Sequence, residues 1–304
     1  MTVKASGNTS PKPYIGRFAP SPSGPLHMGS LIAALASWCD ARSNGGTWLM
    51  RMEDLDPPRE SPEAADQILF QIEALGLHWD GPVLYQSTRP PAYQEAIEAL
   101  ASQGRIFACD CSRQQVHDHD GIYPGTCRNR GLADGPGLAL RCRVTDMTLA
   151  FDDRIQGRQE QNLEQDVGDF IIRRKDGLFA YQLAVVVDDA FQGITDIVRG
   201  IDLMDSTPRQ CYLQQLLDCP AATYAHIPVI VNRDGQKLSK QHMAAPIDTT
   251  HPAPLLLAAL TYLGQDPDPA LSGAAPADIL AWAIRHWDPS RLAGVTVLPE
   301  TRPA

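Results

Sequence analysis

The feature that most constrains the fold of this chain is a short apolar segment that runs through a turn of small residues into a helix. Residues 14–19, Tyr-Ile-Gly-Arg-Phe-Ala, have the composition of a short buried strand, and residues 20–24, Pro-Ser-Pro-Ser-Gly, form the turn. Pro25 suits the first helical position, because its φ is already helical and its missing N–H would be unpaired there. The helix should end at Gly45, and its apolar residues recur at helical spacing at Leu31, Leu35 and Trp38. Such a unit directs backbone N–H groups and the positive helix end toward one point, where a phosphate can bind.

Further elements repeat this order of strand and helix. A second strand is expected over residues 47–53, where Trp48, Met50 and Met52 alternate with Leu49, Arg51 and Glu53. Helices are expected over residues 61–75, 91–103, 254–263 and 277–287, regular apolar patterning resumes at 179–187 and 194–201, and a late apolar strand is expected over 227–231. Strands and helices alternating at this spacing predict an α/β fold with a parallel sheet of the Rossmann type.

One region interrupts the pattern. Residues 107–178 are rich in Gly, Asp, Arg and Cys and lack regular apolar spacing. We therefore predict an insertion between the two halves of the sheet. The expected layout is a tail (1–13), the first half of the Rossmann-type domain (14–106), the insertion (107–178), the second half (179–241) and a short helical region (242–304).

Charge and hydropathy narrow the possible partners. The 304 residues carry a formal net charge of −10, which argues against a general binder of polyanions. A local basic face can coexist with an acidic remainder, and residues 128–143 and 173–175 are candidates for such a face. The sequence contains no apolar run of membrane-spanning length, and its polar start does not resemble a secretory signal. We expect no membrane partner and a cytoplasmic location.

Two segments could bind a nucleotide. His27 lies at the start of the first predicted helix and could donate to phosphate oxygens, and Gly29 leaves room for a nucleotide ring. Residues 237–241, Lys-Leu-Ser-Lys-Gln, follow the late strand, and two lysines three positions apart can reach one triphosphate. Taken alone, each segment has an ordinary alternative: an exposed histidine on a capped helix, and a solvated basic turn.

Together these segments resemble the two signatures of class I aminoacyl-tRNA synthetases, in the form typical of the glutamyl group. Residues 27–30, His-Met-Gly-Ser, match the first signature with serine in place of its last histidine. The late lysine loop matches the second, with Gln241 in place of the usual serine. The resemblance implies that His27 and Lys240 are catalytic and that ATP is bound by Pro20, Gly29, Lys237, Ser239 and Lys240.

A pocket for an amino acid is expected beside the nucleotide. Glu53 follows the second strand, where open α/β sheets bind ligands, and its carboxylate could pair with an ammonium group. Arginine can clamp a carboxylate with two parallel hydrogen bonds. The family resemblance assigns Glu53 to the α-amino group of L-glutamate and the rest of the pocket to Arg17, Ala19, Ser21, Tyr181 and Arg199. Surface salt bridges are the ordinary alternative for any single arginine.

The seven cysteines are odd in number, which argues against a disulfide framework in a chain that is not secreted. Cys109, Cys111 and Cys127 are closely spaced and suit tetrahedral zinc, which needs a fourth ligand. From chemistry alone His117 or His119 is the expected fourth ligand; the family resemblance implies Tyr123 instead. We expect the Zn²⁺ to be structural, because the insertion is too irregular to build its own core. The other four, Cys39, Cys142, Cys211 and Cys219, are expected to pack in the core.

The end of the chain bears on the acceptor RNA. Few residues follow the lysine loop, so we expect no anticodon-binding domain. An intact catalytic core, this cysteine pattern and a short tail resemble the branch of the glutamyl family that activates glutamate without tRNA and esterifies it to queuosine in the anticodon of tRNA(Asp). The resemblance implies ATP with Mg²⁺ as substrate and, we expect, a monomer. The alternatives are a truncated glutamyl-tRNA synthetase that charges tRNA(Glu) and a non-catalytic RNA-binding paralogue.

Overall fold

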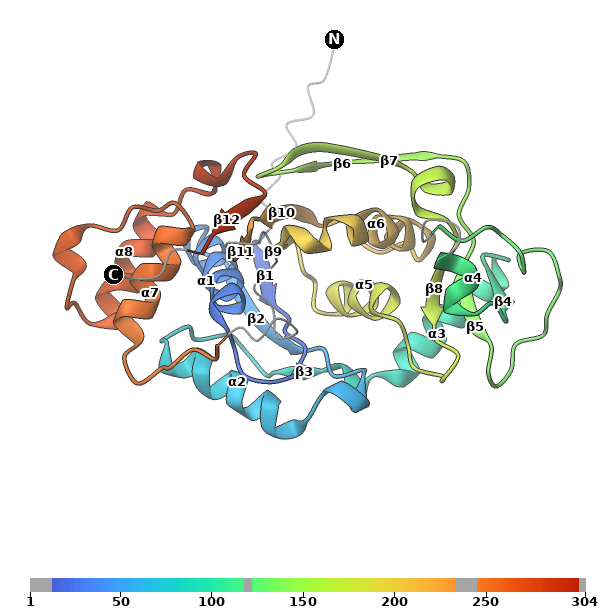
Figure 1. Ribbon diagram of the computed structural model, residues 1–304, viewed down its shortest axis with the longest axis horizontal. Helices are drawn as coiled ribbons and strands as arrows, with labels where there is room; N and C mark the ends of the chain where they lie inside the picture. The colour runs from blue at the N-terminus through green and yellow to red at the C-terminus, as the bar shows by residue number, and fades with distance from the viewer. Residues whose placement is uncertain (1–12, 118–121, 233–244, 301–304) are drawn as a thin grey trace, which may run out of the picture.

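The computed structural model describes residues 13–117, 122–232 and 245–300 (Figure 1). The α-helices are α1 (Met28–Ser43), α2 (Pro62–Ala74), α3 (Pro90–Ser102), α4 (Arg113–His117), α5 (Tyr181–Phe191), α6 (Thr207–Leu216), α7 (Pro252–Tyr262) and α8 (Pro276–His286). The strands are β1 (Ile15–Phe18), β2 (Thr47–Met52), β3 (Leu84–Tyr85), β4 (Ile106–Cys109), β5 (Ala139–Cys142), β6 (Thr148–Asp153), β7 (Gly157–Asn162), β8 (Phe170–Arg173), β9 (Asp196–Gly200), β10 (Thr223–Ile227), β11 (Val229–Val231) and β12 (Val297–Pro299).

Two parallel sets of strands form the centre of the molecule. β1, β2 and β3 pair in the order β1-β2-β3, and β9 pairs in parallel with β10. The two sets meet where Thr195 N donates to Ile15 O at 2.9 Å and Ile15 N donates to Thr195 Oγ1 at 2.8 Å. Strands far apart in the sequence therefore end at the same edge, the arrangement that the alternating pattern predicted.

The second strand is buried on both faces. Trp48, Met50 and Met52 are inaccessible, as their alternation predicts, but Arg51 is 0% exposed and Glu53 8% exposed. The polar face of β2 lies against α5, which supplies carboxylate partners to Arg51. Both faces of a central parallel strand are covered by other parts of the protein. The alternation in β2 therefore places apolar side chains on one buried face and charged side chains on the other.

The first helix begins later than the sequence suggests. Residue 25 is not helical; α1 starts at Met28, and His27 is its N-cap rather than part of its first turn. Leu26 is held extended by tertiary hydrogen bonds, donating to Gln71 Oε1 at 2.8 Å and accepting from Ile247 N at 2.9 Å. The end of α1 is as predicted, because Gly45 has a φ of +63° that favours glycine.

The late strand is divided. Residues 227–231 were expected to form one strand, but β10 ends at Ile227 and β11 begins at Val229. Pro228 lies between them and has no N–H to donate to a ladder. β11 pairs in parallel with β12, near the end of the chain.

The insertion contains more regular structure than its composition indicates. β4, β5 and β8 form an antiparallel sheet, and β6 and β7 form a hairpin joined to β10. The expected irregularity is wrong, but the segment does not bury these residues alone, because Leu140 and Ile172 lie in one cluster with Leu183 of α5 and Leu213 of α6. The insertion shares a core with the second half of the sheet.

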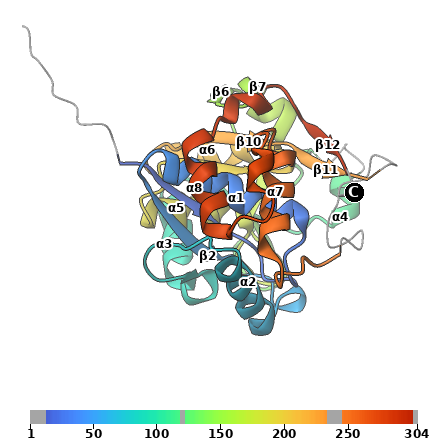
Figure 2. The same ribbon diagram turned by 90° about the vertical axis from the view of Figure 1, so that its left-hand side faces the viewer.

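The C-terminal helices α7 and α8 pack together against α1 (Figure 2), close to the two helices predicted. Leu256, Leu260 and Ile279 are fully buried in the cluster that also contains Leu35 of α1. Trp287, which follows α8, donates from Nε1 to Asp40 Oδ1 of α1 at 2.9 Å. Among the described residues, no helix is long and apolar enough to cross a membrane.

Candidate active site

A cavity of about 760 Å³ lies at the edge where β1, β2, β9 and β10 end. Nine of the residues expected to bind substrates line it: Arg17, Ala19, Pro20, Ser21, His27, Gly29, Glu53, Tyr181 and Arg199. They come from four separate stretches of the sequence, which the parallel sheet brings to one place. Lys237, Ser239 and Lys240 lie outside the described residues.

The described neighbours of the lysine loop border the same cavity. Before the loop in the sequence, Val229 and Ile230 of β11 line the cavity. After the loop, Pro246 forms an antiparallel bridge with His27. Both flanks of the loop therefore lie beside the first signature.

His27 is oriented by the residue that replaces the second histidine of the signature. Its Nδ1 accepts from Ser30 N at 3.3 Å, and its Nε2 lies 3.2 Å from Ser30 Oγ. Because Nδ1 accepts a hydrogen bond, the proton of the neutral ring is on Nε2. In this tautomer the Nε2–H is directed at Ser30 Oγ, so Ser30 holds the ring through both nitrogens at the edge of the cavity.

Beneath the cavity, buried charges neutralise one another. Arg17 Nε is 3.2 Å from Asp189 Oδ1, and Arg51 contacts the same carboxylate oxygen at 2.8 Å and Glu53 Oε1 at 3.3 Å. Burial alone would raise the pKa of Asp189, but Arg17 and Arg51 outweigh it and lower that pKa. The two guanidinium groups therefore favour the charged form of Asp189, which in turn fixes both arginines.

The charge of the Glu53 carboxylate is compensated less completely by nearby cations than that of Asp189. Burial raises its pKa, and the nearby guanidinium groups of Arg51 and Arg17 only partly oppose this effect. A cation arriving in the cavity would stabilise the charged carboxylate. The environment of Glu53 therefore suits the ammonium group that the family resemblance assigns to it.

Arg199 differs from Arg17 and Arg51. It is 5% exposed, and its guanidinium donates to His226 Nε2 at 3.0 Å, Tyr181 Oη at 3.3 Å and Thr207 Oγ1 at 2.7 Å. All of these partners, which are described residues, are neutral oxygen or nitrogen acceptors. Its charge is available to an anionic ligand.

Sequence reasoning missed several of these supporting residues. Ser30, Asp189, Thr207 and His226 were not identified as partners of the site. Two consecutive acidic residues, Asp188 and Asp189, inside an otherwise apolar helix were the available signal, because unpaired carboxylates are rarely buried. His226 gave no comparable signal, since its role depends on which strand lies next to β10.

A second cavity, of about 870 Å³, extends from the first toward the insertion and shares Ser21, Glu53 and Tyr181 with it. Its cationic lining residues are Arg59, Arg113, Arg141, Arg174, Lys175 and Arg209. Several acidic residues, including Asp56 and Asp176, line it as well and pair with Arg174. We call this cavity the cleft.

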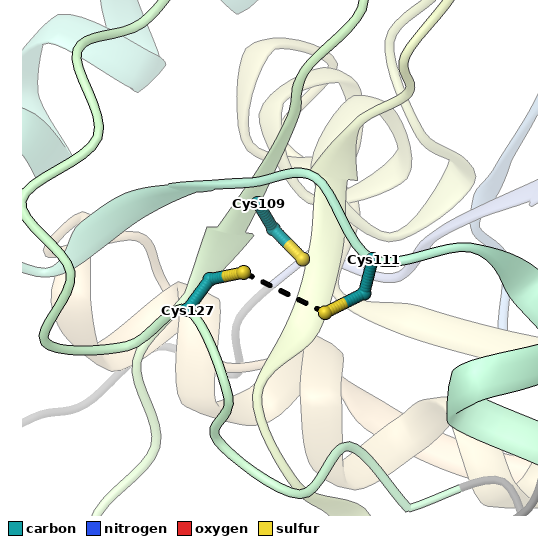
Figure 3. A group of neighbouring side chains, drawn as sticks. All are labelled: Cys109, Cys111 and Cys127. Atoms are coloured by element: carbon teal, nitrogen blue, oxygen red, sulfur yellow. Dashed lines mark hydrogen bonds between the residues drawn. The ribbon is translucent and has the colours of Figure 1, made fainter.

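The insertion carries a compact group of three cysteines, the cysteine cluster (Figure 3). The sulfur atoms of Cys109, Cys111 and Cys127 all lie within 4.8 Å of one another and are buried. Zn–S bonds of about 2.3 Å at tetrahedral angles place sulfur atoms roughly 3.8 Å apart. Cys111 Sγ and Cys127 Sγ are 3.5 Å apart, so the donors fit a zinc ion.

Tyr123 lies at the same cluster. Its Oη is 3.4 Å from Cys109 Sγ and 3.6 Å from Cys111 Sγ, and it accepts from Cys127 N at 2.7 Å. Burial opposes ionisation of Cys109, but contacts with Tyr123 and Arg141 lower its pKa. His119 lies outside the described residues, as does the side chain of His117. Tyr123 therefore has the position of a fourth ligand, and the histidine alternative stays open.

The other four cysteines lie apart from this cluster. Cys39 and Cys142 are fully buried, as expected of core residues, whereas Cys211 and Cys219 are half-buried. All seven cysteines are free thiols.

Comparison with known proteins defines the class. The family described as "tRNA synthetases class I (E and Q), catalytic domain" matches residues 15–252. The chain is also similar in fold to a glutamate tRNA ligase from Elizabethkingia meningosepticum, determined in complex with its amino acid. That similarity has a TM-score of 0.76 at 23% identity and covers 93% of this chain and 66% of that one.

Relatives narrow the class further. A glutamyl-Q tRNA(Asp) synthetase from Pseudomonas entomophila is 56% identical over 287 residues, covering 94% of this chain and 97% of that protein. One from Pseudomonas aeruginosa is 53% identical over 289 residues, covering 95% and 98%. The chain therefore belongs to the glutamyl-Q tRNA(Asp) synthetase family, within the class I synthetases of the glutamate and glutamine group.

Proposed function

We propose that this chain activates L-glutamate with ATP to glutamyl-adenylate and transfers the glutamyl group to queuosine in the anticodon of tRNA(Asp). One observation carries the proposal: residues suited to an ammonium group, a carboxylate and a phosphate line a single cavity. Glu53 supplies an incompletely compensated anion, Arg199 a cation with neutral partners, and His27 an imidazole N–H at the edge of the cavity.

In the first step the α-carboxylate of glutamate attacks the α-phosphorus of ATP, and pyrophosphate leaves. No general base is needed, because the nucleophile is already an anion. We assign His27 and Lys240, with the Mg²⁺ that accompanies ATP, to the charge that builds on the phosphate oxygens in the transition state. Pro20, Gly29, Lys237 and Ser239 are assigned to ATP, and Arg17, Ala19, Ser21, Glu53, Tyr181 and Arg199 to glutamate.

In the second step a hydroxyl of the acceptor attacks the mixed anhydride and releases AMP. The cleft opens directly onto the cavity, which gives an acceptor a route to the adenylate. Cationic side chains along it suit a phosphate backbone, and the acidic residues among them limit the general attraction of polyanions. The cis-diol of queuosine resembles the ribose diol at a tRNA 3′ end, so one pocket can serve either acceptor.

We assign the cysteine cluster to a structural Zn²⁺ held by Cys109, Cys111, Cys127 and Tyr123. Bound zinc would fix the loop between β4 and β5 against the sheet of the insertion, which forms one wall of the cleft. The proposal also includes the boundaries 107–178 for the insertion. It further includes that the enzyme is a monomer and acts in the cytoplasm, where its tRNA is.

Two assays test the function. Labelled pyrophosphate should exchange into ATP in the presence of glutamate and the absence of RNA. Glutamate should then be transferred to queuosine-containing tRNA(Asp), but to neither its unmodified form nor tRNA(Glu). Exchange that requires tRNA(Glu), with transfer to that tRNA, would favour a truncated glutamyl-tRNA synthetase.

Loss-of-function variants separate an enzyme from a non-catalytic RNA-binding paralogue. His27→Ala and Lys240→Ala should each lower pyrophosphate exchange by roughly 100-fold or more, the size expected when a donor to transition-state charge is removed. An unchanged exchange rate in both variants would remove these residues from the mechanism.

A further inference from the structure

A buried chain of hydrogen bonds runs behind Arg199 across two neighbouring pairs of strands. Arg199 of β9 and His226 of β10 are register partners, so their side chains lie side by side. Asp153, at the end of β6, is paired with Tyr224 of β10 and lies next to His226. The side chains of His226 and Asp153 are both 0% exposed.

The geometry fixes the tautomer of His226. Its Nδ1 is 2.6 Å from Asp153 Oδ2, and its Nε2 is 3.0 Å from Arg199 Nε, which can only donate. The ring proton must therefore be on Nδ1, donated to Asp153, while Nε2 accepts from Arg199. Asp153 is itself held by the backbone N–H groups of residues 155 and 156 at 3.0 and 2.8 Å.

The ring is also neutral. Burial lowers the pKa of His226, and the charge of Arg199 lowers it further, against the raising effect of Asp153. Hydrogen bonds from His226 and from the backbone lower the pKa of Asp153, although burial opposes this. The chain thus consists of an anion, a neutral ring and a cation, and the ring separates the two charges.

The other arginine assigned to glutamate is held differently. Arg17 is in direct contact with the carboxylate of Asp189, which neutralises much of its charge. Arg199 is held by His226 through a hydrogen bond that orients the guanidinium, and among the described residues its side-chain partners carry no negative charge. A site built in this way prefers a carboxylate to an amide, because an amide would leave a buried cation without a counter-charge.

We propose that His226, oriented by Asp153, is a positioning residue for Arg199 that sets both the affinity for glutamate and its preference over glutamine. The proposal rests on the assignment of Arg199 to glutamate in the proposed function. It assigns a role to two residues that touch neither substrate.

Two substitutions of His226 test the hydrogen bonds of its two ring nitrogens separately. His226→Gln can present an amide oxygen near the position of Nε2 and accept from Arg199. His226→Asn can present an amide N–H near Nδ1 and donate to Asp153, but it does not reach Arg199. Both variants replace the ring with a smaller amide and differ from each other by one methylene, so the loss of the ring itself is common to both.

The measurement is the KM for glutamate and for ATP in pyrophosphate exchange without RNA, with glutamine as competing substrate. We expect His226→Asn to raise the KM for glutamate roughly 10-fold, the size of one hydrogen bond to a charged group, and to reduce the preference over glutamine. His226→Gln should stay within about 3-fold of the native KM. The KM for ATP should be unchanged in both. Because KM does not depend on the active fraction, partial misfolding cannot produce this difference.

Asp153→Asn provides an independent arm. The amide of this variant would donate to Nδ1 of His226 and so move the ring proton to Nε2. Nε2–H and Arg199 Nε–H would then be two donors facing each other without an acceptor. The KM for glutamate should therefore rise as in His226→Asn. Tyr224→Phe is the matched control, since it removes a buried hydroxyl from β10 but keeps the ring beside Arg199. Its KM for glutamate should stay native.

The outcomes are distinguishable. No exchange in the native enzyme would refute the proposed function itself. Native exchange with equal changes in His226→Asn and His226→Gln, or with an unchanged KM for glutamate in His226→Asn, would overturn the positioning role alone.

Discussion

The cavity and the cysteine cluster bury polar atoms in opposite ways. At the cavity, Asp189 pairs with both Arg17 and Arg51, and the three residues come from α5, β1 and β2. At the cluster, three thiols from one short stretch of chain face one another and contact a phenol. Carboxylates and guanidiniums satisfy each other, whereas ionised thiols repel one another. The cavity is therefore preorganised by the protein alone, whereas in the cluster the proposed Zn²⁺ would offset that repulsion.

This difference predicts where each site is vulnerable. Substitutions that break the ion pairs of the cavity should destabilise the whole fold, because these pairs join the two halves of the sheet. Damage to the cluster should stay within the insertion and affect the acceptor rather than glutamate activation. The following experiments test that contrast.

Asp189→Asn should have the largest effect. It leaves Arg17 and Arg51 buried with a neutral partner in place of an anion, and breaking a buried ion pair in this way costs about 3–5 kcal/mol of unfolding free energy. Urea unfolding measures the loss. Glu160→Gln is the control, because its pair with Arg158 is exposed and should contribute less than about 1 kcal/mol. Equal effects in the two variants would contradict the account of the cavity.

Cys127→Ser tests the dependence of the cluster on an ion. Elemental analysis should find one zinc per native chain and none in the variant. With free zinc at roughly 100–1,000 times its Kd, the apparent stability lost is about 3–4 kcal/mol. Pyrophosphate exchange should persist while transfer to tRNA falls, because the cavity draws its residues from other strands.

Cys219→Ser is the control for the loss of a thiol, since Cys219 is half-buried and lies apart from the cluster. It should retain zinc. A native protein without zinc, or a Cys127→Ser variant that still binds it, would end the proposed metal site.

The residues that line the cavity could be predicted from the sequence, whereas the residues behind them could not. Arg17, His27 and Glu53 follow or adjoin predicted strands, and the carboxyl ends of parallel strands meet at one edge. The approach of His27 and Glu53 to one edge could therefore be inferred from local pattern, whereas Arg17 was assigned to the pocket by the family resemblance. His226 could not, because it becomes the partner of Arg199 only through the register of β9 with β10.

Element boundaries failed where distant contacts override local preference. Pro25 is an acceptable first residue for a helix, yet hydrogen bonds from Leu26 to Gln71 and from Ile247 to Leu26 hold the chain extended there. The insertion looked irregular because its apolar residues complete a core that α5 and α6 also form. Neither effect is visible in a window of neighbouring residues.

Tyr123→Phe addresses the fourth ligand and has a smaller expected effect. Removing one ligand while three thiolates remain should weaken zinc binding by roughly 10–100-fold without abolishing it. Competition with a chromogenic chelator measures the affinity. His117→Ala and His119→Ala should leave it unchanged; a loss in either of these, with none in Tyr123→Phe, would assign the ligand to histidine.

The smallest effect concerns pH and the neutral ring behind Arg199. The pKa values of His226 and Asp153 are both lowered in the folded protein, so the unfolded chain binds more protons as the pH falls. Stability that is present above the ordinary histidine pKa of about 6.5 is therefore lost on acidification, by at most roughly 1.4 kcal/mol per pH unit for one proton. His226→Gln removes the titrating ring, so between pH 7 and 5 its unfolding free energy should fall less steeply than that of the native protein. A slope as steep as the native one would mean that His226 is already protonated in the fold, and a charged ring could not separate Asp153 from Arg199 as the cavity requires.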